Sequence, residues 1–178
     1  AAGASTGRLR WLASMVAARF DPAVHNQRRL VEHLGASPAD TLAAFRHVVT
    51  STTAPSRHLA AWLGEVVVHA QDIRRPLGIA TAPSPDAVTR VARFYASRDF
   101  AVNSKTAASG LRLEATDGPF SSGDGPLVTG TTLALVMAMA GRTLAPDELT
   151  GPGADTLRAR AGTRPSPETT DADRPGPR

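Results

Sequence analysis

Two residues able to bind a metal or exchange protons, Glu65 and His69, stand four positions apart in the segment AAWLGEVVVHAQDIRRPLG, residues 60-78. Four residues make slightly more than one turn of an α-helix, so both side chains can reach one point. A histidine nitrogen and a carboxylate oxygen are a familiar pair of zinc ligands, to which a neighbouring helix can add a third. The spacing therefore fits a metal site. Asp72 is placed to contact a metal ligand without binding the metal itself.

The same pair also has a purely structural interpretation. Glu65 and His69 can form an i,i+4 hydrogen-bonded pair at the rim of a helical bundle, which stabilises a helix by roughly 0.2–0.5 kcal/mol. The string E-x-x-x-H is very common, so spacing alone favours this second interpretation. The rest of the sequence has to decide between the two.

The first hundred residues contain helical signals throughout. Apolar spacing and start signals predict five helices that begin near residues 7, 21, 37, 56 and 84. The third has the clearest start, with Ser37 as N-cap, Pro38 at the first helical position and Asp40 in the first turn. The fourth carries the Glu65–His69 pair and an apolar stripe that we expect to be core. The members of this stripe are Leu59, Trp62, Leu63, Val66, Val67, Ala70 and Ile73.

After residue 105 the pattern changes to an alternating one. LRLEATDG and LVTG are extended segments separated by the turn residues SSGDGP, which predicts a β-hairpin. TTLALVMAMAGR is apolar almost all round and predicts a buried helix packed on that sheet, and a last helix begins near Gly153. Residues 162–178 are rich in Pro, Thr, Asp and Arg and predict a disordered tail. The fold class expected is α+β.

Composition excludes several classes of function. The chain has no cysteine, which rules out a cysteine nucleophile and thiolate metal ligands, so any thiol chemistry must come from a cofactor. Its net charge is +4, but nineteen of its twenty basic residues are Arg and only 4% of residues are aromatic, so nucleic-acid binding is not expected. No run of eighteen apolar residues and no secretory signal is present, and we expect no membrane contact and a cytoplasmic location.

Five blocks, in this order, resemble the mycothiol-dependent maleylpyruvate isomerase family. They are VHAQDIRRPLG at a helix end, GLRLEATDG, SSGDGP, the apolar helix ending in MAMAGR, and LTGPG. The resemblance covers residues 7–160 and implies a DinB-like helical bundle joined to a small sterol-carrier-like α/β domain. The organisation expected is an incomplete bundle at 1-80, a helix plus α/β domain at 81-161 and a tail at 162-178.

The resemblance also implies roles for particular residues. Glu65 and His69 would be two of three ligands of a zinc or other divalent ion, and Arg142 would project toward that ion from the second domain. The family's remaining ligand is a histidine in an A-H-L segment that this chain lacks, so we expect an N-terminally truncated chain. Possible substitutes are His25, His33 and His47, although a surface interpretation suits each of them better.

Three arginines in these blocks can each be interpreted in two ways. Arg74 and Arg75 could bind the cofactor, or they could be a solvated pair at a helix C-terminus before Pro76. Arg142 could stabilise the negative charge of a substrate. Alternatively, its positive charge could interact favourably with the dipole of the helix that it follows.

The activity implied is isomerisation by addition and elimination of a thiolate, with mycothiol supplying the thiol and zinc lowering its pKa. The small-molecule partner would be an electrophile such as maleylpyruvate. Two alternatives stay open: a mycothiol S-transferase acting on another electrophile, and a non-catalytic protein that binds metal or thiol. A truncated bundle would also leave apolar helix faces uncovered, with an exposed groove beside Glu65, and favour self-association.

Overall fold

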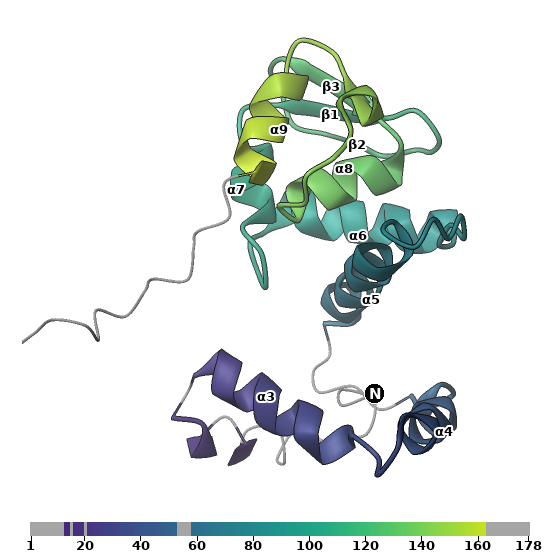
Figure 1. Cartoon of the computed structure of the whole chain (residues 1–178). Coiled ribbons are helices and arrows are strands. Elements are labelled where there is room, and N and C mark those ends of the chain that lie inside the picture. Colours follow the sequence, from purple (N-terminus) through teal and green to yellow (C-terminus); the bar gives the residue numbers. More distant parts are fainter. Residues whose placement is uncertain (1–12, 15, 20, 53–57, 163–178) are drawn as a thin grey trace, which may run out of the picture. The chain divides into compact units, whose positions relative to one another are not determined.

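The computed structural model describes residues 13–14, 16–19, 21–52 and 58–162. Seven α-helices and a four-stranded mixed sheet among these residues confirm the α+β class (Figure 1). The chain divides into two compact units, Ala1–Trp62 and Leu63–Arg178. The domain ranges expected from sequence stay predictions. Most of the predicted first helix, and the predicted tail beyond Gly162, lie outside the described residues.

The first unit contains helices α3 (Pro22–His33) and α4 (Pro38–Val48). The start of α4 confirms the prediction from sequence: the Ser37 hydroxyl accepts a hydrogen bond from the Asp40 backbone N–H at 3.2 Å. A side chain at this position satisfies one of the N–H groups that the first turn leaves without a partner. None of the residues of α4 is buried, so this helix carries an apolar face that is not part of a core.

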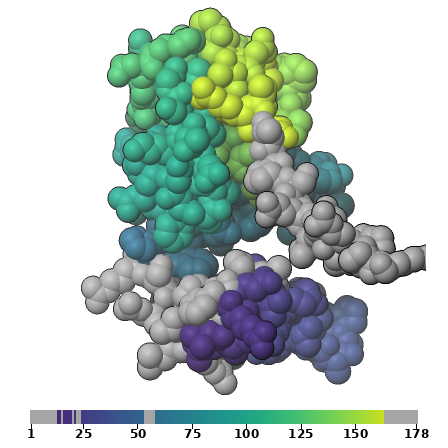
Figure 2. Space-filling view, turned by 90° about the vertical axis from the view of Figure 1, so that its left-hand side faces the viewer, coloured from purple at the N-terminus to yellow at the C-terminus, as the bar shows by residue number. Residues whose placement is uncertain are grey.

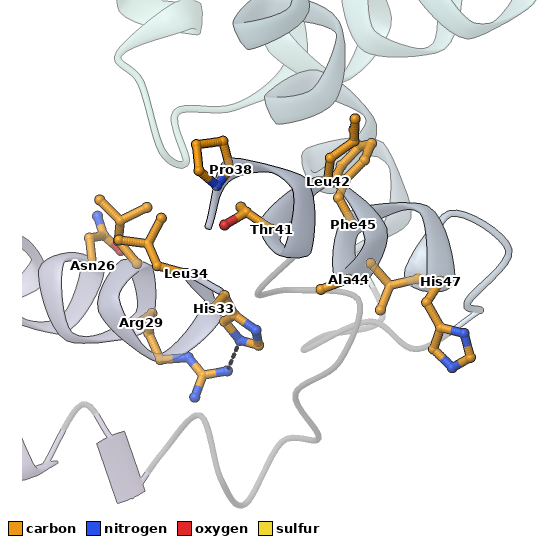
Figure 3. Close-up of a pocket in the computed structure, with 12 residues that line it drawn as sticks. Asn26, Arg29, His33, Leu34, Pro38, Thr41, Leu42, Ala44, Phe45 and His47 are labelled. Atoms are coloured by element: carbon orange, nitrogen blue, oxygen red, sulfur yellow. Dashed lines mark hydrogen bonds between the residues drawn. The ribbon is translucent and has the colours of Figure 1, made fainter. Parts of the chain in front are cut away.

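Apolar side chains of α3 and α4 face a common groove of about 890 Å³ (Figure 3). Leu30 and Leu34 are each 55% exposed, and Phe45 is 50% exposed. Large apolar side chains so close together and so exposed are unusual on a monomer. The groove has the size of a ligand site, but its lining is mostly apolar and offers little chemistry.

Helix α5 (Leu59–Arg74) spans the border between the units and corrects part of the sequence prediction. Of the stripe expected to be core, Val67 is buried, whereas Leu59, Val66 and Ile73 are between 63% and 70% exposed, as an uncovered bundle face would be. The buried positions of α5 are Ala61, Gly64, Val67, Val68 and Gln71. At Gly64 this face meets the Tyr95 side chain of α6, and periodicity alone does not report that contact.

The sheet of the second unit has the strand order β2-β1-β3-β4. Its strands are β1 (Arg112–Ala115), β2 (Ser121–Ser122), β3 (Leu127–Gly130) and β4 (Leu149–Thr150). The hairpin predicted between the first and third of these strands is wrong: β1 and β3 are parallel, and β1 forms its antiparallel pair with β2. The chain turns twice, once before and once after β2, and so β3 starts beside the start of β1.

Helix α8 (Thr132–Met139) lies between the sheet and helix α6 (Pro85–Ser97), as Figure 1 shows. It contacts β1 and β3 on one side, α6 on another and α9 on a third. Its leucine, valine and methionine side chains from Leu135 to Met139 are at most 1% exposed. This central position explains the all-round apolar sequence and confirms the predicted buried helix. No helix in the described ranges is long and apolar enough to cross a bilayer.

Two short helices close one end of the second unit. Helix α7 (Ser104–Ala108), which the sequence did not predict, starts where Asp99 accepts hydrogen bonds from the Thr106 backbone and hydroxyl. Helix α9 (Ala154–Gly162) reaches it through Arg160, which donates to the carbonyls of Ala107 and Ser109 at 2.9 and 2.7 Å. Figure 2 shows the yellow surface of α9 adjoining the teal surface of this part of the chain. Both α7 and α9 also contact α8.

Candidate functional site

Three polar side chains stand on one face of α5, in the second unit. His69 Nε2 lies 3.2 Å from Glu65 Oε2, and His69 Nδ1 lies 3.1 Å from Asp72 Oδ2. Their spacing of four and three residues places them on consecutive turns, so one imidazole contacts a carboxylate at each ring nitrogen. The two contacts orient the ring and aim Nε2 toward Glu65.

The two ring nitrogens of His69 face one carboxylate each, and the side chain is 61% exposed. A neutral imidazole has one N–H and can donate to only one of the two carboxylates. If Nδ1–H donates to Asp72, the lone pair of Nε2 faces the Glu65 carboxylate, and two lone pairs at 3.2 Å repel one another. A metal ion placed between Nε2 and Oε2 would be bound by both atoms. A carboxylate behind the distal ring nitrogen is also the usual support of a metal-bound histidine.

The spacing of the two donors fits zinc. Bond lengths of about 2.0–2.1 Å at a tetrahedral angle place two ligand atoms about 3.3 Å apart, and Glu65 Oε2 and His69 Nε2 are 3.2 Å apart. Groups of three or more His, Asp or Glu side chains arranged to hold a metal are absent from the described part of the chain. The described residues therefore offer two donors, and both have the atom types that zinc prefers.

Arg142 reaches the same place from the end of α8. Gly141 has a φ of +77°, and the backbone N–H groups of Gly141 and Arg142 donate to the carbonyls of Ala138 and Met137, which is a Schellman turn. This turn fixes the backbone from which the guanidinium extends. Arg142 Nε donates to Asp72 Oδ1 at 3.2 Å and Nη2 donates to Asp72 Oδ2 at 2.8 Å. The predicted site residues Glu65, His69 and Arg142 are thus brought together.

The Arg142–Asp72 pair is electrostatically well matched. Hydrogen bonds from Arg142 hold the pKa of the Asp72 carboxyl below its usual range, and His69 lowers it further. The same hydrogen bonds raise the pKa of Arg142. Asp72 therefore stays ionised and Arg142 stays charged throughout the neutral range. Three of the five guanidinium N–H groups are engaged by Asp72 and the Ala140 carbonyl, which leaves two for a ligand.

Glu65, His69 and Arg142 line a cavity of about 200 Å³ in the second unit. Its lining consists of Glu65, Val68, His69, Tyr95, Ala101, Val102 and Arg142. Pockets that enclose a whole drug-sized ligand are usually about 300–1,000 Å³. This one can hold a small reacting group, with the remainder of a larger ligand lying outside it.

Tyr95 on α6 is the lining residue that sequence reasoning missed. It is 5% exposed, and a Cβ atom at Gly64 would lie 2.7 Å from its hydroxyl oxygen, so the glycine leaves room for the phenol here. Burial, with the nearby Glu65 carboxylate adding to it, raises the pKa of Tyr95 to about 12. The hydroxyl therefore keeps its proton. A single tyrosine on the buried face of an amphipathic helix has no sequence signal that separates it from the core.

The remaining predicted residues lie away from this cavity. Arg75 forms an ion pair with Glu148 at 2.8 Å, and Arg74 donates to the Thr81 carbonyl, so neither lines the cavity. Their cofactor-binding role stays a prediction. The suggested substitute ligands belong to the first unit: His25 is buried on α3, His33 contacts Arg29 at 3.0 Å, and His47 lines the apolar groove.

In a comparison with known proteins, no family model, curated protein or solved structure matches the chain. The site is therefore interpreted from its own geometry and from the motifs of the sequence.

Proposed function

We propose that the protein is a mycothiol-dependent, zinc-assisted enzyme of the maleylpyruvate isomerase type, which isomerises a double bond by thiolate addition and elimination. The observation that carries this proposal is the meeting of Glu65, His69 and Arg142 at one cavity, although Arg142 is more than seventy positions away in sequence. Two metal donors beside a charged guanidinium suit a reaction between a thiol and an anionic electrophile. The five sequence blocks resemble those of that family.

Each side chain has a part in this proposal. When bound, zinc would lower the pKa of a thiol, and mycothiol would supply that thiol. Glu65 and His69 hold the ion, and Asp72 fixes the Nδ1–H tautomer of His69. Arg142 binds the oxygen that carries negative charge, using the N–H groups that Asp72 leaves free. Apolar Val68 and Val102 limit access of water to the cavity.

The finer architecture belongs to the same proposal. Helices α3, α4 and α5 would be parts of a DinB-like bundle, and the mixed sheet with α8 and α9 would be the sterol-carrier-like domain. The exposed apolar faces of α3 and α4 support an incomplete bundle. A cytoplasmic location is consistent with a reaction that needs a reduced low-molecular-weight thiol.

Zinc titration of the full chain tests the metal site directly. We expect one zinc ion per chain, bound weakly because the described residues offer two donors. Glu65→Gln should weaken binding by more than the roughly 10–100-fold that is typical when an outer hydrogen bond to a metal ligand is lost. Asp72→Asn should stay within that range. The control is Glu114→Gln, which pairs with Arg112 on β1 and does not line the cavity. Equal affinities for Glu65→Gln and Glu114→Gln would exclude this metal site.

Turnover separates the candidate activities. Purified chain with zinc and mycothiol should convert maleylpyruvate to fumarylpyruvate, and omission of mycothiol should abolish the reaction. Consumption of mycothiol with other electrophiles, without isomerisation, would favour the S-transferase alternative. Zinc binding with neither reaction would favour a non-catalytic binding protein.

A further inference from the structure

We infer that Tyr95 is a second ligand-binding donor of the cavity, which acts beside Arg142 on a negatively charged oxygen of the bound molecule. This inference rests on the proposed function for the class of molecule, namely an unsaturated carboxylate or keto acid. It goes beyond that function in assigning a site role to a residue that none of the sequence motifs contains.

The first support is the position of the phenol at the cavity. Within residues 13–14, 16–19, 21–52 and 58–162, no hydrogen-bond partner is found for the Tyr95 hydroxyl, although the residue is 5% exposed. The hydroxyl oxygen is not a fully buried atom in the described part of the chain, so its O–H is open to the cavity and available to a bound molecule. The cavity that Tyr95 lines, with Glu65, His69 and Arg142, is a place where a ligand can accept this hydrogen bond.

The second support is the positioning of the ring. Tyr95 belongs to the hydrophobic core, and the absence of a side chain at Gly64 leaves room for its hydroxyl on the surface of α5. Its backbone carbonyl accepts from the buried Ser104 hydroxyl at 3.0 Å, which ties this turn of α6 to the start of α7. The phenol is thus held rigidly, and a rigid donor costs little entropy when a ligand arrives.

The third support is the charge balance. Arg142 offers two N–H groups and Tyr95 offers an O–H, so the cavity combines one cation with one neutral donor for the same oxygen. Glu65 opposes an anion in this position, and a zinc ion on Glu65 and His69 would offset that repulsion. A neutral donor that keeps its proton up to high pH is suited to an oxygen that gains charge during a reaction.

The chain contains a single tyrosine, which gives the test its selectivity. The 178-residue chain labelled with [13Cζ]tyrosine shows one phenol resonance in the NMR spectrum, and that resonance reports on Tyr95. The probe is maleate, titrated into the metal-free chain and into the chain with one equivalent of zinc. Maleic diamide, which has the same shape without charge, is the control ligand.

We expect maleate, and not the diamide, to shift the 13Cζ resonance saturably in at least one of these two samples. Tyr95→Phe should weaken maleate binding by about 10-fold or more, as is typical for loss of a hydrogen bond to a charged group. The variant keeps the ring, and an unchanged circular dichroism melt would show that the core is intact. Shifts in the Arg142 Nε–H signal without any 13Cζ shift would overturn the inference, as would the absence of maleate binding in both samples.

Failure of this inference and failure of the proposed function can be told apart. If zinc does not bind and mycothiol does not react, but maleate moves the tyrosine resonance, the enzyme proposal fails and the Tyr95 donor stands. If zinc and mycothiol support turnover while Tyr95→Phe leaves kcat, KM and maleate affinity unchanged, the donor role fails and the enzyme proposal stands.

Discussion

Asp72 receives both arms of the Arg142 guanidinium, with Nε–Oδ1 and Nη2–Oδ2 distances of 3.2 and 2.8 Å, and contacts His69 Nδ1 with the same Oδ2 at 3.1 Å. One carboxylate thus orients a candidate metal ligand and a candidate substrate-binding cation. Because α5 and the end of α8 contribute one partner each, the pair also ties these two elements together.

Asp72→Asn should destabilise the second unit by about 1 kcal/mol, since a forked arginine pair is stronger than a usual surface ion pair but is here partly solvated. Urea unfolding at neutral pH measures the effect. The control is Asp155→Asn, whose carboxylate side chain is 98% exposed and pairs with Arg158 within one turn of α9. A control variant that loses as much stability as Asp72→Asn would contradict the assigned role of the fork.

Asp117 should make stability depend on acidity. Its Oδ1 accepts from the Thr132 backbone N–H at 2.7 Å and from the Thr132 hydroxyl at 2.6 Å, at the start of α8. Burial acts to raise the pKa of Asp117, but these hydrogen bonds outweigh burial and lower it. The unfolded chain then binds more protons than the folded one as the pH falls from about 5, so the free energy of unfolding should decrease through that range.

The matched variant for this dependence is Asp117→Asn. It should lose roughly 1–2 kcal/mol at pH 7, as expected when a helix start loses its charged acceptor. Its unfolding free energy should also fall less steeply than that of the wild type between pH 5 and pH 3. Parallel pH profiles for the two proteins would show that Asp117 does not carry this linkage.

Gly64→Ala should destabilise the protein, although alanine ordinarily stabilises a helix by about 1 kcal/mol relative to glycine. The new methyl group would lie 2.7 Å from the Tyr95 hydroxyl oxygen, so the phenol has to move. Tyr95→Phe in the same chain should recover part of the loss by removing that oxygen. Gly162→Ala is the control, because nothing lies within 4 Å of a Cβ there. Thermal melts of the four proteins settle the prediction.

The apolar groove between α3 and α4 should promote self-association. Phe45→Glu places a charge on a residue that is 50% exposed beside Leu30 and Leu34, so it should shift the chain toward monomer without lowering its melting temperature. Sedimentation velocity over a range of concentrations measures the shift. A wild-type chain that stays monomeric at all concentrations would refute this use of the groove.

The sequence by itself determined what is local in this protein. Ser37, Pro38 and Asp40 specify the start of α4 because a cap acts over three residues, and the unbroken apolar run in α8 identifies a helix that is buried on all sides. The proximity of Glu65 and His69 also follows from helical spacing alone. Each of these features depends on bonds or contacts within about two turns of chain.

Only the tertiary structure decided the contacts that join distant segments. The fork between Asp72 and Arg142, the approach of Tyr95 to Gly64 and the parallel pairing of β1 with β3 depend on how separate elements pack. Hydrophobic periodicity reports which positions can be buried, but it does not specify which neighbour covers them. For this reason periodicity predicts only part of the buried face of α5, and no sequence pattern distinguishes the phenol of Tyr95 from the side chains of the core.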